Sequence, residues 1–369
     1  MIEKSFLSPR ESGHVVAKNS KHIKIDDNGI ESCAKEVVER IQSGQIKLVN
    51  EVTKEGEGTN VNFLKKDIVH PQVADQHGVD WVFFMDALNF SFWNFSTGTH
   101  KQYLVTYKGV TYTGYLAFLA ATCRTLDSGV PITTPSFYGN VTKEDLNSFL
   151  VGDDGVECPL IEERVVCLHQ ISKVLEQKFG HTFVNCIKFC ESTPGNKAQN
   201  LLNLVYNEFP CFRDEAEYIP EVGKPPIKVA FMKRAQILIA DLWSLFENKG
   251  LGQFDDIASL TMFADYRVPQ SLQYFGAFKY SDALLNELNK SDVVMENGSE
   301  FEIEIRGCSI EAVDRIVKRV KQLLKDTNEE KMSKYVNDVA IDYFLWGFRR
   351  EKADEMIKFP YHKVRSIYY

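Results

Sequence analysis

The sequence predicts a mainly α-helical fold with one small β-hairpin and minor strands. Apolar residues recur at helical spacing in most segments, and glycines follow several of these segments where a helix would end. Strand-like alternation is confined to short stretches. The chain has 369 residues, of which 44% are hydrophobic and 12% aromatic, so a substantial core is expected.

Residues 1–28 are expected to form an N-terminal arm with one short helix. No linker or internal repeat interrupts the rest, so we expect a single compact domain spanning residues 1–369. The aromatic tail, residues 359–369, is expected to dock on this body. Helices are predicted at about 30–41, 79–88, 115–127, 142–150, 161–178, 198–209, 229–248, 256–263, 269–275, 282–289, 309–325 and 336–352.

Two segments have strand signals. Residues 102–107 and 110–113 flank Lys108-Gly109, a pattern typical of a β-hairpin. Residues 301–305 alternate between apolar and acidic side chains, which predicts one further strand.

Composition excludes several classes of protein. A net charge of −8 argues against a nucleic-acid binder that works by phosphate neutralisation. Neither a Walker loop nor a Gly-x-Gly-x-x-Gly motif occurs, which disfavours an ATPase or a dinucleotide enzyme. The N-terminus lacks a signal-peptide pattern, and no apolar run reaches membrane-spanning length. The eight cysteines are scattered along the chain, as is typical of free thiols in a reducing compartment. We therefore expect a cytoplasmic protein without membrane partners.

The segment around Asp265 is the strongest candidate for a site. Asp265 follows an apolar run and precedes Tyr266 and Arg267, and Pro269 then disfavours a continuous helix. Burial raises a carboxyl pKa and a neighbouring cation lowers it, so such an acid can be tuned for chemistry. The alternative interpretation is a helix-capping aspartate with an incidental arginine neighbour.

Two further segments carry polar groups in apolar surroundings. Lys233 and Arg234 lie in the apolar helix predicted at 229–248, where a charge must pair or meet a ligand. A structural ion pair, a contact with Asp265 and an anion site are the alternatives for Lys233. Asn89, Phe90, Ser91 and Trp93 combine rings with amide and hydroxyl groups, which suits a flat heterocycle as well as plain core packing.

Several unusual strings resemble the queuosine salvage family. They occupy residues 8–12, 86–93, 233–238, 262–270, 304–308 and 367–369. The resemblance implies a helical body similar to helical DNA glycosylases. It also implies hydrolysis of queuosine 5′-phosphate to queuine and ribose 5-phosphate, which salvages queuine for tRNA modification, with no metal or organic cofactor. The family's catalytic aspartate falls on Asp265, its active-site lysine on Lys233, and its base-binding segment on residues 89–93.

The chemistry of this bond indicates what the side chains must supply. Cleavage develops positive charge on the sugar, which Asp265 could oppose electrostatically or by forming a covalent ester. The departing 7-deazaguanine lacks N7, so donors to O6 or a proton delivered elsewhere on the base must compensate, and His70 and Asn89 are candidates for this role. Candidates for the 5′-phosphate are Lys233, Arg234 and Arg267, with hydroxyl groups from Tyr266 and the tail residue Tyr369.

Two other functions fit part of the pattern. A glycosylase acting on bases in nucleic acid would need a basic groove, which the net charge disfavours. A non-catalytic protein that binds a modified nucleotide would use the aromatic segment and keep Asp265 as a helix cap. Ligand binding without product would distinguish this second alternative.

Overall fold

The helices dominate the fold, as predicted. The computed structural model describes residues 7–46, 68–93, 101–290, 293–327 and 329–369. The glycines and asparagines of residues 51–62 predict an exposed loop, and this segment lies outside the described residues. Contacts divide the chain into two compact units, each built from several separated segments. The organisation of both units as a single domain stays a prediction.

The first unit comprises Met1–Phe63, Asp214–Gln236 and Phe254–Val364. Its strands form two antiparallel pairs, β1 with β6 and β4 with β5. Its elements are α1 (Pro9–Asn19), β1 (Ile23–Ile25), α2 (Asp27–Gln42), β4 (Glu215–Tyr218), β5 (Ile227–Ala230), the 3-10 helix η4 (Ile257–Ser259), α11 (Val268–Tyr274), β6 (Phe278–Tyr280), α12 (Asp282–Leu288), α13 (Glu300–Asp326), α14 (Glu330–Ser333), α15 (Asp338–Glu351) and α16 (Ala353–Met356).

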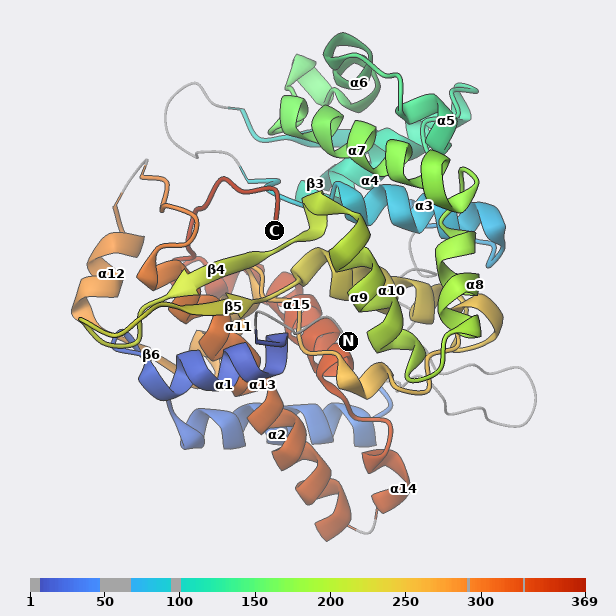
Figure 1. The fold of residues 1–369 in the computed structure, drawn as a ribbon. Helices are drawn as coiled ribbons and strands as arrows, with labels where there is room; N and C mark the ends of the chain where they lie inside the picture. The colour runs from blue at the N-terminus through green and yellow to red at the C-terminus, as the bar shows by residue number, and fades with distance from the viewer. Residues whose placement is uncertain (1–6, 47–67, 94–100, 291–292, 328) are drawn as a thin grey trace. The chain divides into compact units, whose positions relative to one another are not determined.

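The long helix α13 is the centre of the first unit and packs against α1 and α2 (Figure 1). Two glycines permit a close approach of α1 and α13. A Cβ on Gly307 would lie 2.5 Å from Val16, and one on Gly13 would lie 2.6 Å from Ile310. Such distances are far inside van der Waals contact, so larger residues at these positions would force the helices apart.

The second unit comprises Leu64–Arg213, Ile237–Gln253 and Arg365–Tyr369. Helix α10 (Lys233–Leu245) begins in the first unit and continues into this one. The other elements are α3 (Gln76–Ala87), β2 (Leu104–Tyr107), β3 (Val110–Thr113), α4 (Gly114–Asp127), α5 (Pro135–Tyr138), α6 (Lys143–Leu150), η1 (Asp153–Gly155), α7 (Ile161–Phe179), α8 (Val184–Ser192), α9 (Lys197–Glu208), η2 (Pro210–Phe212) and η3 (Gly250–Gly252).

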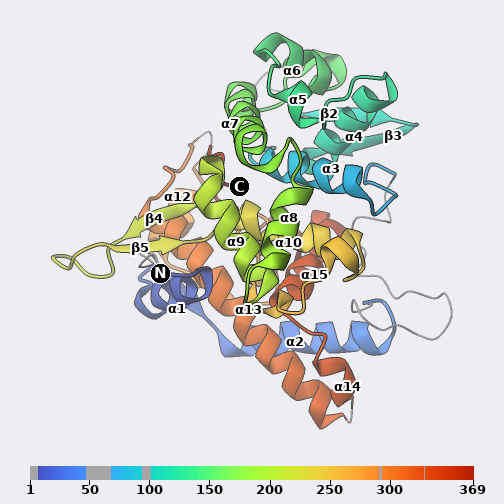
Figure 2. The ribbon, with the colours of Figure 1, turned by 45° about the vertical axis from the view of Figure 1, so that its right-hand side comes forward.

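An aromatic cluster lies in the core of the second unit, where α3, α7, α8 and α9 gather (Figure 2). The ring of Phe83 stacks on Phe183 at 4.2 Å and meets Phe209 edge-on at 5.2 Å. Such offset and edge-on pairs add to the free energy gained from burial alone. The predicted hairpin is confirmed as β2 and β3, with Lys108 and Gly109 both at positive φ in the turn.

Three sequence predictions are wrong, for identifiable reasons. The helix predicted at 229–248 begins only at Lys233, because residues 227–230 pair with β4 as strand β5. Residues 301–305 form the start of α13, because Ser299 caps the helix by accepting the N–H of Glu302. The alternating acidic residues do not mark an exposed face, because they are buried and hydrogen-bonded. Glu304, for example, accepts the backbone N–H groups of Lys21 and His22. The helix predicted at 256–263 is only the short η4, and its last residues are irregular.

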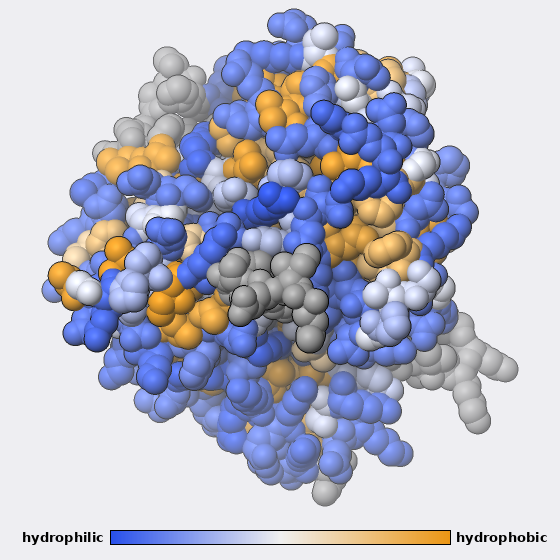
Figure 3. Space-filling model, in the orientation of Figure 1, coloured by the Kyte–Doolittle hydropathy of each residue, from blue (hydrophilic) through white to orange (hydrophobic). Residues whose placement is uncertain are grey.

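The surface in the view of Figure 3 is mainly hydrophilic, with scattered hydrophobic residues. Isolated apolar residues of this kind are normal on folded proteins. Among the described residues, no helix has the length and apolar character needed to cross a membrane.

Candidate active site

Asp265 lies in the irregular segment that precedes α11. Its Oδ1 accepts the backbone N–H groups of Arg267 and Val268, both at 2.8 Å. Asp265 thus accepts the N–H of Val268, the first residue of α11, although the N-cap position of this helix is Arg267. These hydrogen bonds use only one carboxylate oxygen, and among the described residues no hydrogen bond to Oδ2 accompanies them. They fix the carboxylate while leaving an oxygen for chemistry.

The environment of Asp265 tunes its protonation. Burial raises the pKa of the carboxyl group above its ordinary value. The N–H groups of Val268 and Arg267, together with the charges of Lys233 and Arg267, act in the opposite direction. Desolvation, the larger effect, and positive charge thus act in opposite directions on the pKa of one carboxyl group, a combination that is common at functional sites.

Side chains from other elements hold the backbone that leads to Asp265. Gln236 accepts the N–H of Thr261 at 2.8 Å, and Asp342 accepts the N–H of Phe263 at 3.0 Å. Arg306 donates to the carbonyl of Ala264 at 3.0 Å. Each side chain satisfies a buried backbone group that a helix would otherwise pair. This explains why the segment is not helical.

Lys233 begins α10, and two residues, Phe231 and Met232, separate it from the end of strand β5. Its backbone N–H donates to Asp214 Oδ2 at 3.0 Å, so Asp214 caps this helix. The preceding residue, Met232, has φ of 50°, which is unfavourable for a residue other than glycine. The turn from strand to helix is therefore strained, and the Asp214 contacts help to maintain it.

A buried ion pair joins these two segments. Arg306, on α13, donates to both carboxylate oxygens of Asp214, at 2.8 and 2.6 Å. Its guanidinium also lies 4.3 Å from the centre of the Phe231 ring. Arg306 thus contacts the residue before Asp265 and the carboxylate that caps the helix of Lys233. One side chain positions both catalytic candidates.

Arg234 and Arg267, the two arginines predicted for the site, differ in solvent exposure. Arg234 is 1% exposed, whereas Arg267 is half-buried. The Arg267 guanidinium lies 4.1 Å from the centre of the Tyr361 ring and 5.2 Å from that of Tyr266. Burial raises the pKa of Tyr266 to about 12, so its hydroxyl stays protonated and can donate a hydrogen bond.

The predicted aromatic segment lies in the second unit and binds the C-terminal tail. The Ser91 N–H donates to the Tyr369 carbonyl at 3.0 Å, and the Ser91 hydroxyl donates to the Ser366 carbonyl at 2.8 Å. The Arg365 guanidinium lies 4.0 Å from the centre of a ring of Trp93. The expectation that the tail docks on the body is confirmed for these residues.

The same contacts leave little of this segment exposed. The backbone of Ser91 has a positive φ of 48° where its N–H donates to the Tyr369 carbonyl. Both residues belong to the second unit. Asn89 donates to Asp86 Oδ1 at 3.2 Å, and Arg164 donates to the Phe90 carbonyl at 2.6 Å. Local partners thus fix the shape of the segment, and its role in binding stays a prediction.

The structure distributes the predicted site residues over both units. Asp265, Lys233, Arg234, Tyr266 and Arg267 belong to the first unit. The second unit contains His70, Asn89, Phe90, Ser91, Trp93 and Tyr369. His70 is buried, with its ring 6.4 Å from that of Trp81.

Sequence reasoning missed the residues that organise the site. Asp214, Arg306 and Asp342 make their contacts with residues far away in sequence, and no local pattern marks them. The available signal for Arg306 was its place in the string 304–308, which resembles the family.

Comparison with known proteins gives the family. The sequence model of the queuosine salvage protein family matches residues 69–369, a range that contains every predicted site residue. The chain is 41% identical over 363 residues to the queuosine 5′-phosphate N-glycosylase/hydrolase of Mus musculus, covering 98% of this chain and 99% of that protein. The chain therefore belongs to the queuosine salvage protein family.

More distant relatives carry the same name. The protein of Schizosaccharomyces pombe is 34% identical over 377 residues, covering 97% of this chain and 99% of the relative. That of Sphaerobacter thermophilus is 33% identical over 290 residues, covering 79% and 81%.

Replacing Arg306 with methionine tests the buried ion pair. Arg306→Met leaves the Asp214 carboxylate buried without its partner, which is expected to lower the free energy of unfolding by about 3–5 kcal/mol. Urea-induced unfolding measures this change. The matched control is Arg315→Met on the same helix, where the partly exposed pairs with Asp27 and Glu311 contribute at most about 1 kcal/mol. Equal losses in both variants would contradict the assigned role of Arg306.

Proposed function

We propose that this protein hydrolyses the N-glycosidic bond of queuosine 5′-phosphate and releases queuine and ribose 5-phosphate. The observation that carries the proposal is the fixed carboxylate of Asp265. One of its oxygens accepts two backbone N–H groups, and the charges of Lys233 and Arg267 act on it. The names of the relatives support the same substrate and reaction. Released queuine would then be available for tRNA modification.

Asp265 acts on the sugar in this proposal. As the bond to the base breaks, positive charge develops near C1′ of the ribose. A carboxylate fixed in advance stabilises that charge without reorganising during the reaction. Both an electrostatic role and a covalent sugar ester are consistent with a fixed carboxylate oxygen, and water completes the hydrolysis in either case.

Lys233 supports the reactive form of Asp265. Its positive charge lowers the pKa of the carboxyl group and so opposes the effect of burial. We propose that this keeps Asp265 ionised at neutral pH. The strained turn at Met232 and the cap from Asp214 hold the lysine at the start of α10.

We assign recognition of the base to the second unit. The support is the family resemblance together with the local combination of rings, amide and imidazole groups. The residues of this proposal are His70, Asn89, Phe90, Ser91, Trp93 and Tyr369.

We further propose that the substrate is a free nucleotide in the cytoplasm, with no direct contact to nucleic acid or membrane. The net charge of −8 opposes association with a polyanion. Seven of the eight cysteines are buried, and burial raises the pKa of the Cys190 thiol to about 11. Buried thiols of this kind suit a reducing compartment.

Replacing Asp265 with asparagine tests its catalytic role. The asparagine side chain would keep an oxygen to cap α11 but would lose the negative charge, so Asp265→Asn should lower kcat at least about 10²–10³-fold. Chromatography of released queuine measures the rate. Asp255→Asn, at an exposed acid in the same region, is the control and should retain activity. Full activity of Asp265→Asn would exclude the proposed mechanism.

The pH dependence of kcat tests the pairing with Lys233. The ionised carboxylate is the reactive form, so activity should fall as the pH drops through the pKa of Asp265. Lys233→Met removes a charge that lowers this pKa, so the acidic limb should move to higher pH. Lys228→Met, which instead loses a pair with Glu215, should leave the limb in place. An unmoved limb in Lys233→Met would show that the lysine does not tune Asp265.

A further inference from the structure

Two arginines of the first unit converge on one buried amide. Arg267, at the start of α11, donates through Nη1 to Gln270 Oε1 at 3.1 Å. Arg349, on α15, donates through Nε to the same oxygen at 3.2 Å. Gln270 is fixed in turn because its Nε2 donates to the Phe359 carbonyl at 2.6 Å. Two elements distant in sequence are thus arranged around a single acceptor.

This arrangement leaves many N–H donors available. A guanidinium group has five, and the hydrogen bonds to Gln270 use one from each arginine. Among the described residues, neither Arg267 nor Arg349 forms an ion pair with a carboxylate within 4.0 Å. Both side chains are half-buried, so a small ligand can reach them.

The two positive charges oppose one another. Burial and the neighbouring Arg267 lower the pKa of Arg349 to about 10. Like charges in a partly desolvated place are unfavourable without an anion between or beside them. An anion with several oxygens would relieve this repulsion and accept bidentate hydrogen bonds.

We propose that Arg267 and Arg349 together bind the 5′-phosphate of the substrate. This assignment rests on the proposed function and extends it to Arg349, which no sequence pattern marked. Arg267 is two residues after Asp265 and donates its backbone N–H to that carboxylate, so the phosphate site adjoins the reactive group. The buried Arg234 is less accessible, and Lys233 acts on Asp265 instead.

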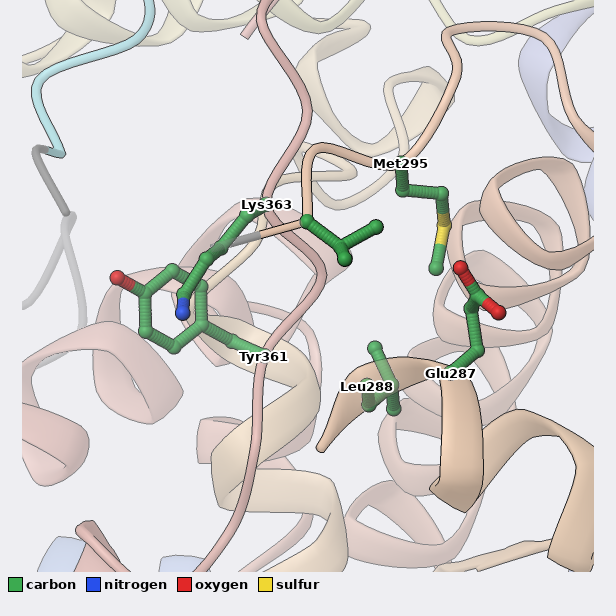
Figure 4. A pocket seen from close by; sticks show the side chains of 6 residues that line it. Glu287, Leu288, Met295, Tyr361 and Lys363 are labelled. Atoms are coloured by element: carbon green, nitrogen blue, oxygen red, sulfur yellow. The ribbon is translucent and has the colours of Figure 1, made fainter. Parts of the chain in front are cut away.

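Aromatic rings complete one side of this site. The Tyr361 ring lies 4.1 Å from the Arg267 guanidinium and 5.6 Å from the ring of Tyr266. Tyr361 also lines a small pocket, where it lies with Lys363 opposite Met295 and Glu287 (Figure 4). We do not assign the phosphate to that pocket, because Glu287 would repel an anion. The rings instead restrict the orientation of Arg267.

Binding of ribose 5-phosphate tests the proposal without requiring turnover. Isothermal titration calorimetry should show that Arg349→Met weakens binding of ribose 5-phosphate at least about tenfold, because charge-assisted hydrogen bonds are lost. Arg350→Met is the matched control, since it removes the same charge from an exposed neighbour that stacks on Trp346. It should bind ribose 5-phosphate as the wild type does.

A second variant and a second assay make the result decisive. Arg349→Lys keeps the charge but loses the planar fork, so it should weaken binding to a smaller extent. If Arg349→Met does not fold, this variant decides the question. Wild-type affinity in a folded Arg349 variant would overturn the phosphate assignment. Absence of queuine release by the wild type would instead overturn the proposed function, and binding of ribose 5-phosphate would still report on the arginines.

Discussion

The buried ion pair between Arg306 and Asp214 determines the geometry on which the first unit depends. Arg306 reaches the carbonyl of Ala264 while both of its terminal nitrogens contact Asp214. Asp214 in turn caps the helix that begins at Lys233. Buried ion pairs often contribute little net stability because desolvation opposes their attraction. Here the bidentate ion pair has a structural consequence, because it holds the segment that ends at Ala264 and the start of the helix at Lys233 in fixed positions.

The chemistry of the site depends on how burial and neighbouring positive charges act on the carboxyl group of Asp265. Burial raises the pKa of Asp265, and the positive charges of Lys233 and Arg267 lower it. Arg267 and Arg349 share the oxygen of Gln270 and present their remaining donors to a ligand. One region can therefore provide a carboxylate for the sugar and cations for a phosphate. These are the groups that hydrolysis of a nucleotide N-glycosidic bond requires.

Local patterns predicted much of the fold. The hairpin could be recognised from Lys108-Gly109, and most helices from their apolar spacing and the glycines that follow them. Residues 301–305 were mistaken for a strand because buried glutamates imitate an alternating surface. The segment before Asp265 was mistaken for a helix because its backbone partners, such as Gln236 and Asp342, come from other elements.

The candidate site shows the same limit. Asp265 and Lys233 stood out because each is a charge within an apolar segment, and the family resemblance supported both. Asp214 could not be predicted, because its partner Arg306 lies 92 residues away and only the fold brings them together. Arg349 is one of two adjacent arginines in the last turn of α15, and no sequence pattern marks it; its partial burial and its contact with Gln270 distinguish it from the exposed Arg350.

The most direct test of the central claim is incubation of the purified protein with queuosine 5′-phosphate, with queuine and ribose 5-phosphate followed together by chromatography. The account predicts that both products form in equal amounts, and that the unphosphorylated nucleoside is a much poorer substrate. Binding of the nucleotide without release of either product would contradict the account, and would identify Asp265 as a structural helix cap.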